Sequence, residues 1–278
     1  MKKINRRSFL AAAGLTAAAL ALTACGGSAS STASSTASSA ASSEAASTSA
    51  AAELTTVEAG KLTMATNATF PPYEMTTDSG EIEGIDVDTA KAIAEKLGLE
   101  PQIDDMDFDA ALLSVQQGKA DIVMAGVTVT DERKAVMDFS DSYATGIQSI
   151  IVPEGSDITS PDDLAGKKIG TQRGTTGYIY CSDDFGDDAV VAYDDGLTAV
   201  QALKNGQVDA VVIDNAPAKE YVAANPGLVI LDTSYAEEDY AIGMAKGSAL
   251  EDAVNAALEE LKADGTLQSI VDKYITAE

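Results

Sequence analysis

The chain has 278 residues, of which 45% are hydrophobic and 22% are charged, and its formal net charge is −26. This length and apolar content suffice for one large or two modest globular units. So acidic a chain would be repelled by nucleic acid and by anionic lipid, and we expect neither as a direct partner. Because the sequence contains no histidine, a histidine-based triad and a histidine-ligated metal are excluded.

Residues 1–24 are predicted to be an export signal peptide. Basic residues at the start are followed by an apolar run and then by small residues, which is typical of such signals. The apolar run is too short and too alanine-rich for a transmembrane helix. N-R-R-S-F-L at residues 5–10 resembles a twin-arginine signal, and an ordinary Sec signal with two arginines is the alternative.

Residues 25–53 are predicted to be a lipidated cysteine followed by a flexible tether. L-T-A-C at residues 22–25 resembles the lipobox of bacterial lipoproteins, which implies a diacylglycerol group on Cys25; a cleaved signal with a free cysteine is the alternative. The tether consists almost only of Ser, Ala and Thr, so it lacks the large apolar groups that would offset its ordering entropy. We expect a protein outside the cytoplasm, anchored by this lipid alone to the outer face of the cytoplasmic membrane, at the cell surface or in a periplasm.

The next part of the chain alternates predicted strands with predicted helices. Helix 86–97 carries an apolar stripe and ends at Gly98, a typical C-terminal cap, and residues 67–73 have turn chemistry. The other predicted elements are strands at 61–66, about 102–104 and 122–124, and a helix at 109–117. Strands and helices in alternation predict an α/β fold with a largely parallel sheet.

A motif for binding an anion follows the strand at 122–124. Residues 125–141 read A-G-V-T-V-T-D-E-R-K-A-V-M-D-F-S-D, so helix-capping residues precede a helical turn that carries Arg133. Free backbone N–H groups and one guanidinium facing the same space would hold a carboxylate. The alternative is that Arg133 is a surface residue paired with Glu132 or Asp138.

The second half of the chain repeats the pattern of the first. V-Q-Q-G-K-A-D-I-V at 115–123 aligns with L-K-N-G-Q-V-D-A-V at 203–211, each a helix that ends at Gly and returns through Asp into a strand. This recurrence favours two similar lobes. The predicted elements are strands at 168–172, 210–213 and 240–245, and helices at 175–182, 197–205, 248–263 and 265–274.

The motif at 125–141 resembles the signature of the amino-acid-binding proteins of bacterial ABC importers, solute-binding protein family 3. In that family a strand ending in a small pair is followed by T-x-T-D-E-R and D-F-S. The resemblance continues with gaps from about Lys61 to the C-terminus. It implies a type II periplasmic-binding-protein fold, with two α/β lobes, each a mostly parallel sheet flanked by helices, joined by a two-strand hinge. The implied boundaries are 54–143 and 238–278 for one lobe and 144–237 for the other.

The resemblance assigns the α-carboxylate of a ligand to both lobes. Arg133 would bind it bidentately with the backbone N–H of Thr128, and the amides of Thr175 and Thr176 would reach it from the other lobe. The alternative for the two threonines is an ordinary helix cap.

The α-ammonium of the ligand is assigned to Asp214 together with a carbonyl of the Ala125–Gly126 pair. The alternative is that the Asp214 side chain only caps the helix that begins at Asn215.

A side-chain pocket is implied between the first loop and the second lobe. Phe70 and Phe108 would sandwich the ligand side chain, although packing into the core is the alternative for both. Two aromatic faces near Glu74 suit a guanidinium or ammonium. Against this, Asn67 stands where some basic- and glutamine-binding relatives carry Asp, which lowers the negative charge of the pocket and leaves a polar neutral ligand as the alternative. The pocket residues are Asn67, Phe70, Tyr73, Glu74, Phe108, Gln148 and Gln172.

The predicted function is therefore that of a monomeric, membrane-tethered receptor. It would capture a free amino acid, basic with arginine first, or a polar neutral one such as glutamine, and deliver it to an ABC transporter permease. An exported dehydratase-like enzyme is the alternative of another class, and the lack of histidine and of a spare carboxylate base argues against it. We expect no cofactor and no metal, because the acidic clusters lack a metal-ligand spacing. Without histidine, ligand affinity is predicted to be nearly constant between about pH 6 and 8.

Overall fold

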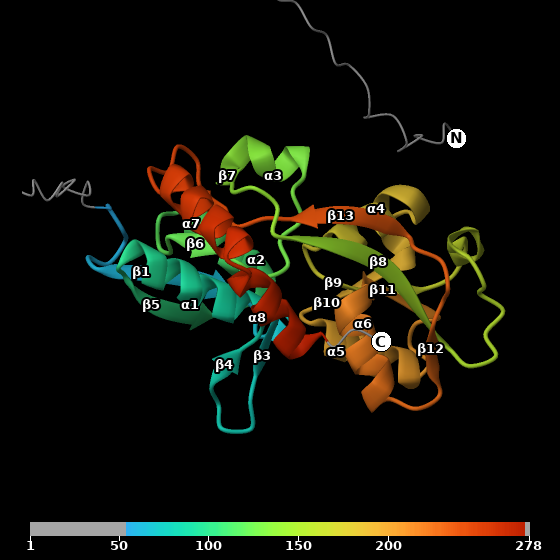
Figure 1. Cartoon of the computed structure of the whole chain (residues 1–278). Helices are drawn as coiled ribbons and strands as arrows, with labels where there is room; N and C mark the ends of the chain where they lie inside the picture. Colours follow the sequence, from blue (N-terminus) through green and yellow to red (C-terminus); the bar gives the residue numbers. More distant parts are fainter. Residues whose placement is uncertain (1–53, 276–278) are drawn as a thin grey trace, which may run out of the picture. The chain divides into compact units, whose positions relative to one another are not determined.

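The computed structural model describes residues 54–275 (Figure 1). The predicted export signal, the lipidation of Cys25 and the tether lie outside the described residues. Among the described helices, none has the length and apolar character needed to cross a membrane.

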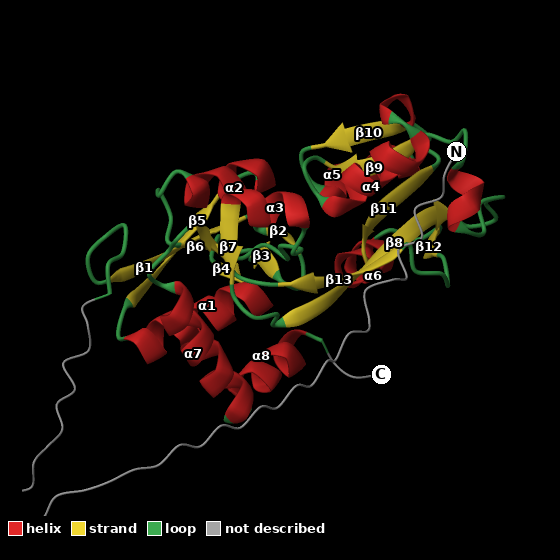
Figure 2. Ribbon diagram, turned by 90° about the horizontal axis from the view of Figure 1, so that it is seen from above, coloured by secondary structure: helices red, strands yellow, loops and turns green. Residues whose placement is uncertain are grey.

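The first lobe is built on a five-stranded sheet in the order β5-β1-β6-β14-β7. Its strands are β1 (Lys61–Thr66), β5 (Glu100–Asp105), β6 (Ile122–Val123), β7 (Met137–Phe139) and β14 (Gly243–Ala245). β1 pairs in parallel with β5 and β6, and β14 runs antiparallel to β6 and β7. Its helices are α1 (Ile85–Leu97), α2 (Phe108–Gln116), α3 (Asp131–Val136), α7 (Glu251–Ala263) and α8 (Thr266–Tyr274). Figure 2 shows α1, α7 and α8 on one face of this sheet and α2 and α3 on the other.

The second lobe is built on a six-stranded sheet in the order β10-β9-β11-β8-β12, with β13 also paired to β8. Its strands are β8 (Ala144–Pro153), β9 (Ile169–Gln172), β10 (Val190–Tyr193), β11 (Ala210–Asp214), β12 (Leu228–Ile230) and β13 (Ala236–Tyr240). Its helices are α4 (Thr176–Phe185), α5 (Gly196–Lys204) and α6 (Asn215–Ala224), with 3-10 turns at Pro161–Leu164 and Asp187–Ala189. β9 pairs in parallel with β10 and β11, and β8 is antiparallel to its neighbours.

The predicted two-lobed α/β fold is confirmed, but the expectation that each sheet is mostly parallel is wrong, because both sheets are mixed. Parallel pairing is confined to the strands joined through helices, because a parallel connection needs a crossover, whereas the strands that return to each sheet arrive antiparallel. The helix stripe is also as expected. Val87, Ala90 and Ala94 are buried, and α1 ends at Gly98 with a left-handed φ of 69°.

The predicted repeat between the two halves is present in atomic detail. Gly118 and Gly206 end α2 and α5 with φ values of 65° and 67°. Asp121 then accepts the Thr63 N–H at 2.8 Å, and Asp209 accepts the Lys168 N–H at 2.7 Å. In each lobe this aspartate, just before β6 or β11, fixes that strand to the start of the strand beside it, β1 or β9.

Two crossing strands connect the lobes. β8 and β13 pair antiparallel from Ala144 opposite Tyr240 to Gln148 opposite Ala236. The single strand predicted at 240–245 is wrong, because the segment divides into β13, which pairs with β8, and β14, which pairs in the first sheet. The segment leaves the second sheet at the end of β13 and joins the first sheet at β14, so the strand is interrupted between the two.

A small three-stranded sheet is inserted between β1 and α1, where the sequence indicated only a turn. It consists of β2 (Thr69–Phe70), β3 (Glu74–Thr76) and β4 (Ile82–Glu83). It packs tightly on the helix start, since a Cβ at Gly84 would lie 2.1 Å from the Tyr73 carbonyl oxygen.

Candidate functional site: a cavity between the lobes

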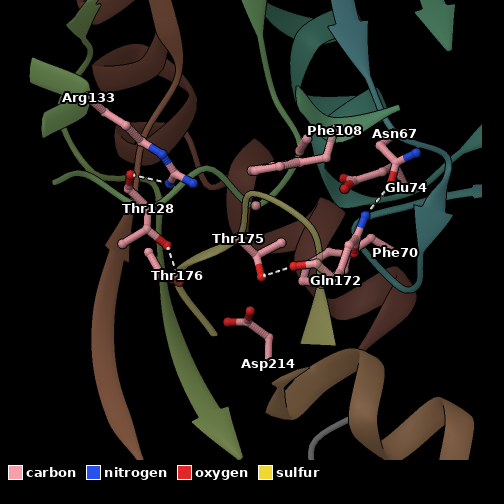
Figure 3. Close-up of a pocket in the computed structure, with 12 residues that line it drawn as sticks. Asn67, Phe70, Glu74, Phe108, Thr128, Arg133, Gln172, Thr175, Thr176 and Asp214 are labelled. Carbon is pink, nitrogen blue, oxygen red and sulfur yellow. Dashed lines mark hydrogen bonds between the residues drawn. The ribbon is translucent and has the colours of Figure 1, made fainter. Parts of the chain in front are cut away.

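A cavity with about 320 Å³ of empty space lies between the two lobes (Figure 3). All the residues that line it belong to the set predicted from the sequence. They are Asn67, Phe70, Glu74, Phe108, Ala125, Gly126, Thr128, Arg133, Gln172, Thr175, Thr176 and Asp214.

The lobes touch one another around this cavity. The amide nitrogen of Gln172 donates to Asn67 Oδ1 at 2.9 Å, and Arg133 Nη2 donates to the Gly174 carbonyl at 3.2 Å. The Tyr221 hydroxyl on α6 also donates to the carbonyl of Thr69 on β2. The cavity is therefore held between lobes that are closed onto each other.

Arg133 is a cavity residue and not a surface residue. Thr130 caps α3 by accepting the Arg133 N–H at 3.2 Å. Arg133 is only 8% exposed, and its guanidinium carbon lies 5.4 Å from the centre of the Phe108 ring. Its Nη1 donates to the Thr128 carbonyl at 2.8 Å. The alternative pairing with Asp138 is wrong, because Asp138 pairs with Lys246. Burial lowers the pKa of Arg133, but an arginine starting so far above neutrality stays cationic.

The crossing strand β13 holds the backbone of the motif in place. Thr128 forms a bridge with Tyr240, and the Val129 N–H donates to the Asp239 carbonyl at 3.0 Å. The motif therefore has a fixed position relative to the strands that join the lobes.

The start of helix α4 faces the cavity from the second lobe. Thr175 accepts the Tyr178 N–H at 3.4 Å, so the helix-cap alternative is correct. Thr175 and Thr176 also line the cavity. N–H groups in the first turn of a helix have no partner within it and attract an anion. The Thr175 N–H itself donates to the Gln172 carbonyl at 3.4 Å. The binding of a ligand carboxylate by these two threonines stays a prediction.

Asp214 ends β11 beside the cavity, and its side chain does not cap α6. No side-chain cap bond is formed; instead Oδ2 accepts from the Gln148 amide at 2.7 Å and Oδ1 accepts from the Tyr240 hydroxyl. The helix-cap alternative is therefore wrong. Burial raises the pKa of Asp214 to about 7, and the charge of Glu238 adds to this rise. A pKa in this range argues against the expectation of a nearly constant affinity between about pH 6 and 8, because the charge of Asp214 then changes within that window.

The far side of the cavity combines aromatic and polar groups. Phe70 and Phe108 are 7% and 6% exposed and belong to the hydrophobic core as well as to the cavity wall, so core packing and cavity lining both apply. Glu74 is fully buried, and neither carboxyl oxygen has a hydrogen-bond partner among the described residues. Burial raises the pKa of Glu74 well above its ordinary value.

Two of the predicted residues, Tyr73 and Gln148, stand behind the cavity wall. The Tyr73 ring packs against Phe70 at 5.9 Å and Tyr240 at 5.3 Å between ring centres, and it lines a separate groove. Gln148 donates to Asp214. Both support lining residues and do not line the cavity themselves.

Glu238 was missed from the sequence although it joins both lobes. It is 7% exposed on β13, and its Oε2 accepts from Thr128 Oγ1 at 3.2 Å, Thr176 Oγ1 at 2.9 Å and Gln148 Nε2 at 3.0 Å. It stands in the acidic run Glu237-Glu238-Asp239, which reads as a solvated strand edge. No local signal distinguishes it.

Asp86 was also missed, because an acid in the first turn of a helix is ordinary. It is fully buried behind the Ala125–Gly126 pair, and its Oδ2 accepts from the Gly126 N–H at 2.9 Å and the Tyr143 hydroxyl at 2.8 Å. Burial raises the pKa of Asp86 to about 6.

Residues 62–277 match the bacterial extracellular solute-binding proteins, family 3. The chain belongs to this family. It is 33% identical over 283 residues to a probable histidine-binding protein of Neisseria gonorrhoeae, covering 99% of this chain and 98% of that protein. The amino-acid ABC transporter substrate-binding protein AbpA of Streptococcus pneumoniae, solved with L-arginine, is 38% identical, with a TM-score of 0.73 over 77% of this chain and 94% of AbpA.

Two solved structures described as an ancestral arginine-binding protein are each 44% identical to this member of the family. One is bound to arginine, with a TM-score of 0.74 over 78% of this chain and 98% of its own. The other is bound to glutamine, with a TM-score of 0.75 over 78% of this chain and 99% of its own. The family and these relatives make the chain an extracellular or periplasmic amino-acid-binding protein of an ABC transporter. It is a transport protein and not an enzyme, so the dehydratase alternative is set aside.

Proposed function

We propose that this family 3 protein captures a free basic L-amino acid, arginine first, in the cavity between its lobes and delivers it to a membrane permease. The supporting observation is the set of ionisable groups around one cavity. Figure 3 shows Arg133 on one side of the cavity and Glu74 on the other, with Asp214 below both in this view. A cation and two acids at three separate places on the cavity wall complement the carboxylate, the ammonium and the cationic side chain of one amino acid.

The ligand carboxylate lies between Arg133 and the start of α4. The guanidinium offers two parallel charge-assisted bonds, and the amides of Thr128, Thr175 and Thr176 complete the site. Arg133 and Thr128 come from the first lobe and the other two from the second. A ligand held by both lobes stabilises their closure about the strands β8 and β13, so capture and hinge motion are linked.

The ligand ammonium lies against Asp214 and a carbonyl of the Ala125–Gly126 pair. Gly126 has a φ of 54°, and a Cβ there would lie 2.8 Å from the Phe70 ring. A larger residue at this position would displace the ring, so glycine brings the backbone close to the ligand.

The ligand side chain passes between Phe70 and Phe108 toward Glu74. Aromatic faces and an ionised carboxylate both favour a guanidinium. A specific observation favours a second candidate, glutamine: the Asn67–Gln172 amide pair lines the same part of the cavity, and a 44%-identical relative has been solved with glutamine.

The proposed setting is a monomer tethered outside the cytoplasm. Cys25 carries the lipid, and residues 25–53 give the folded body its reach toward a permease. The proposed division places residues 54–143 and 238–278 in the first lobe and residues 144–237 in the second.

The test is a thermal-shift screen of residues 54–278 against the twenty amino acids, ornithine and citrulline, because a ligand that binds only the folded state raises the melting temperature. We expect the largest rise with arginine. A rise confined to glutamine and other neutral residues would replace the first candidate by the second. No rise with any of them would refute the amino-acid receptor.

A further inference from the structure

Glu74 is a buried carboxyl with no cation beside it. It lines the cavity from β3, and both oxygens lack a hydrogen-bond partner among the described residues. The charged groups that act on it are all acids: Asp86 on α1, Asp214 on β11 and Asp105 on β5. An isolated buried carboxylate is very unfavourable, so such a group takes up a proton instead.

The acid beside Glu74 is Asp86, whose N–H donates to the carbonyl of the preceding residue, Tyr73, at 2.9 Å. Both carboxyls are fully buried, and Asp86 is the acid whose charge raises the pKa of Glu74 most. Two neighbouring carboxyls away from water and without a cation are not both ionised, so one of them keeps a proton. The Gly126 N–H and the Tyr143 hydroxyl donate to Asp86 and stabilise its charge. Glu74 has no such donors, so the proton resides on Glu74.

We propose that Glu74 and Asp86 share one proton, and that a cationic ligand side chain expels this proton whereas a neutral side chain leaves it in place. The inference rests on the proposed function, because it takes the cavity to be the amino-acid site. With its proton, Glu74 is a donor that can meet an amide oxygen. Without it, Glu74 is an anion that pairs with a guanidinium. The expelled proton passes to solvent, since arginine keeps its own charge.

The other titratable groups around the pair do not compete for this role. Burial raises the pKa of Tyr73, Tyr143 and Tyr221 further above neutrality, so they stay uncharged. Asp214 titrates near pH 7, but it faces the α-ammonium that every amino acid carries. The protons that Asp214 releases are therefore the same in number for every amino acid, and they cancel when the release by two ligands is compared.

Proton release is best compared between arginine and citrulline. Their side chains have the same length and their α-groups are the same, but only the arginine side chain is charged. Calorimetric titration of the purified full chain at pH 7, in two buffers of different ionisation enthalpy, gives the protons released by each ligand. We expect arginine to release about one proton more than citrulline. In Glu74→Gln the two ligands should release equal numbers. Glu83→Gln, the same change in the same small sheet but away from the cavity, should behave as the unchanged protein.

Asp86→Asn separates the shared proton from a merely structural role. Without the neighbouring charge, Glu74 loses its proton at lower pH, so the extra release by arginine should disappear at lower pH than in the unchanged protein. An unshifted profile would show that Asp86 does not share the proton. Equal release by arginine and citrulline in the unchanged protein would overturn the inference and leave the receptor intact. No binding heat with either ligand would overturn this ligand assignment together with the inference.

Discussion

The two lobes share a repeated unit but differ in the connection between its first strand and the helix that follows. In the second lobe, residues 173–175 lead directly from β9 into α4, so the helix begins at the cavity. In the first lobe, residues 67–84 and the small sheet β2–β4 separate β1 from α1. The start of α1 therefore does not line the cavity.

The inserted sheet also occupies the amides of α1. The Ile85 N–H donates to the Pro72 carbonyl at 3.1 Å, and the Asp86 N–H donates to the Tyr73 carbonyl at 2.9 Å. What the insertion offers the cavity instead is side chains, Phe70 and Glu74. Backbone amides suit the carboxylate that all amino acids share, whereas side chains can distinguish one amino acid from another. The comparison therefore predicts that changes outside the insertion abolish binding and that changes within it alter selectivity.

The largest effect is expected for Arg133→Ala, outside the insertion. Removing one partner of a buried charge pair costs about 2–5 kcal/mol, which corresponds to a loss of affinity of about 30-fold to several thousand-fold. Calorimetric titration should show this loss equally for arginine, citrulline and glutamine. Lys134→Ala, at the exposed neighbouring position, is the matched control and should bind normally. Normal affinity in Arg133→Ala would remove the proposed carboxylate site.

The next effect is a pH dependence set by Asp214, also outside the insertion. Burial raises its pKa to about 7, and a ligand ammonium favours the ionised form. Below that pH the ligand must displace a proton, so affinity should fall by about tenfold for each pH unit. Above it, affinity should level off. Citrulline is the ligand of choice because its side chain leaves Glu74 protonated. A constant affinity between pH 5 and 8 would show that Asp214 does not bind the ammonium.

A selective effect is expected for Glu74→Gln, within the insertion. Arginine loses a charge-assisted bond of about 1.5–3 kcal/mol, which lowers its affinity by about tenfold or more. Citrulline should bind within about threefold of the unchanged protein, because an amide replaces a protonated carboxyl at a similar strength. Competition between the two ligands measures the ratio directly. An equal loss of affinity for both ligands would show that Glu74 contributes to the binding of every amino acid and not to selectivity.

Much of this site could be predicted because the relevant signals are local. The strand-loop-helix motif around Arg133 and the Gly-Thr loop before α4 each combine a cap, a turn and a charge within a few residues. The inserted sheet was read only as a turn, because two- and three-residue strands carry too little alternation to detect. Gly126 and Asp214 were found through the resemblance of the surrounding segments to family 3, and the Gly118–Gly206 alignment places them at corresponding positions in the two lobes.

The residues that could not be predicted act through contacts distant in the sequence. Asp86 meets Gly126 and Tyr143, and Glu238 meets Thr128 and Thr176. Nothing near either acid indicates these partners, because only the folded chain brings them together. Burial of an acid is a tertiary property, and so are the pKa shifts that follow from it.

The smallest effect is expected for Glu238. This residue lies on β13, one of the two strands that connect the lobes, and outside the segments that are repeated in both lobes. Glu238→Ala leaves Thr128, Thr176 and Gln148 without their shared acceptor. It also removes the acid whose charge does most to raise the pKa of Arg133. Losing one buried acceptor costs about 1–3 kcal/mol, part of it in folding, so affinity for all ligands should fall by about three- to tenfold. Glu238→Gln keeps an oxygen for the three donors and should recover most of this loss. Glu237→Ala, at the exposed neighbouring position, is the control. A change in the arginine-to-citrulline ratio in Glu238→Ala would show that selectivity is not confined to the insertion, because this residue supports only the groups that bind the common part of the ligand.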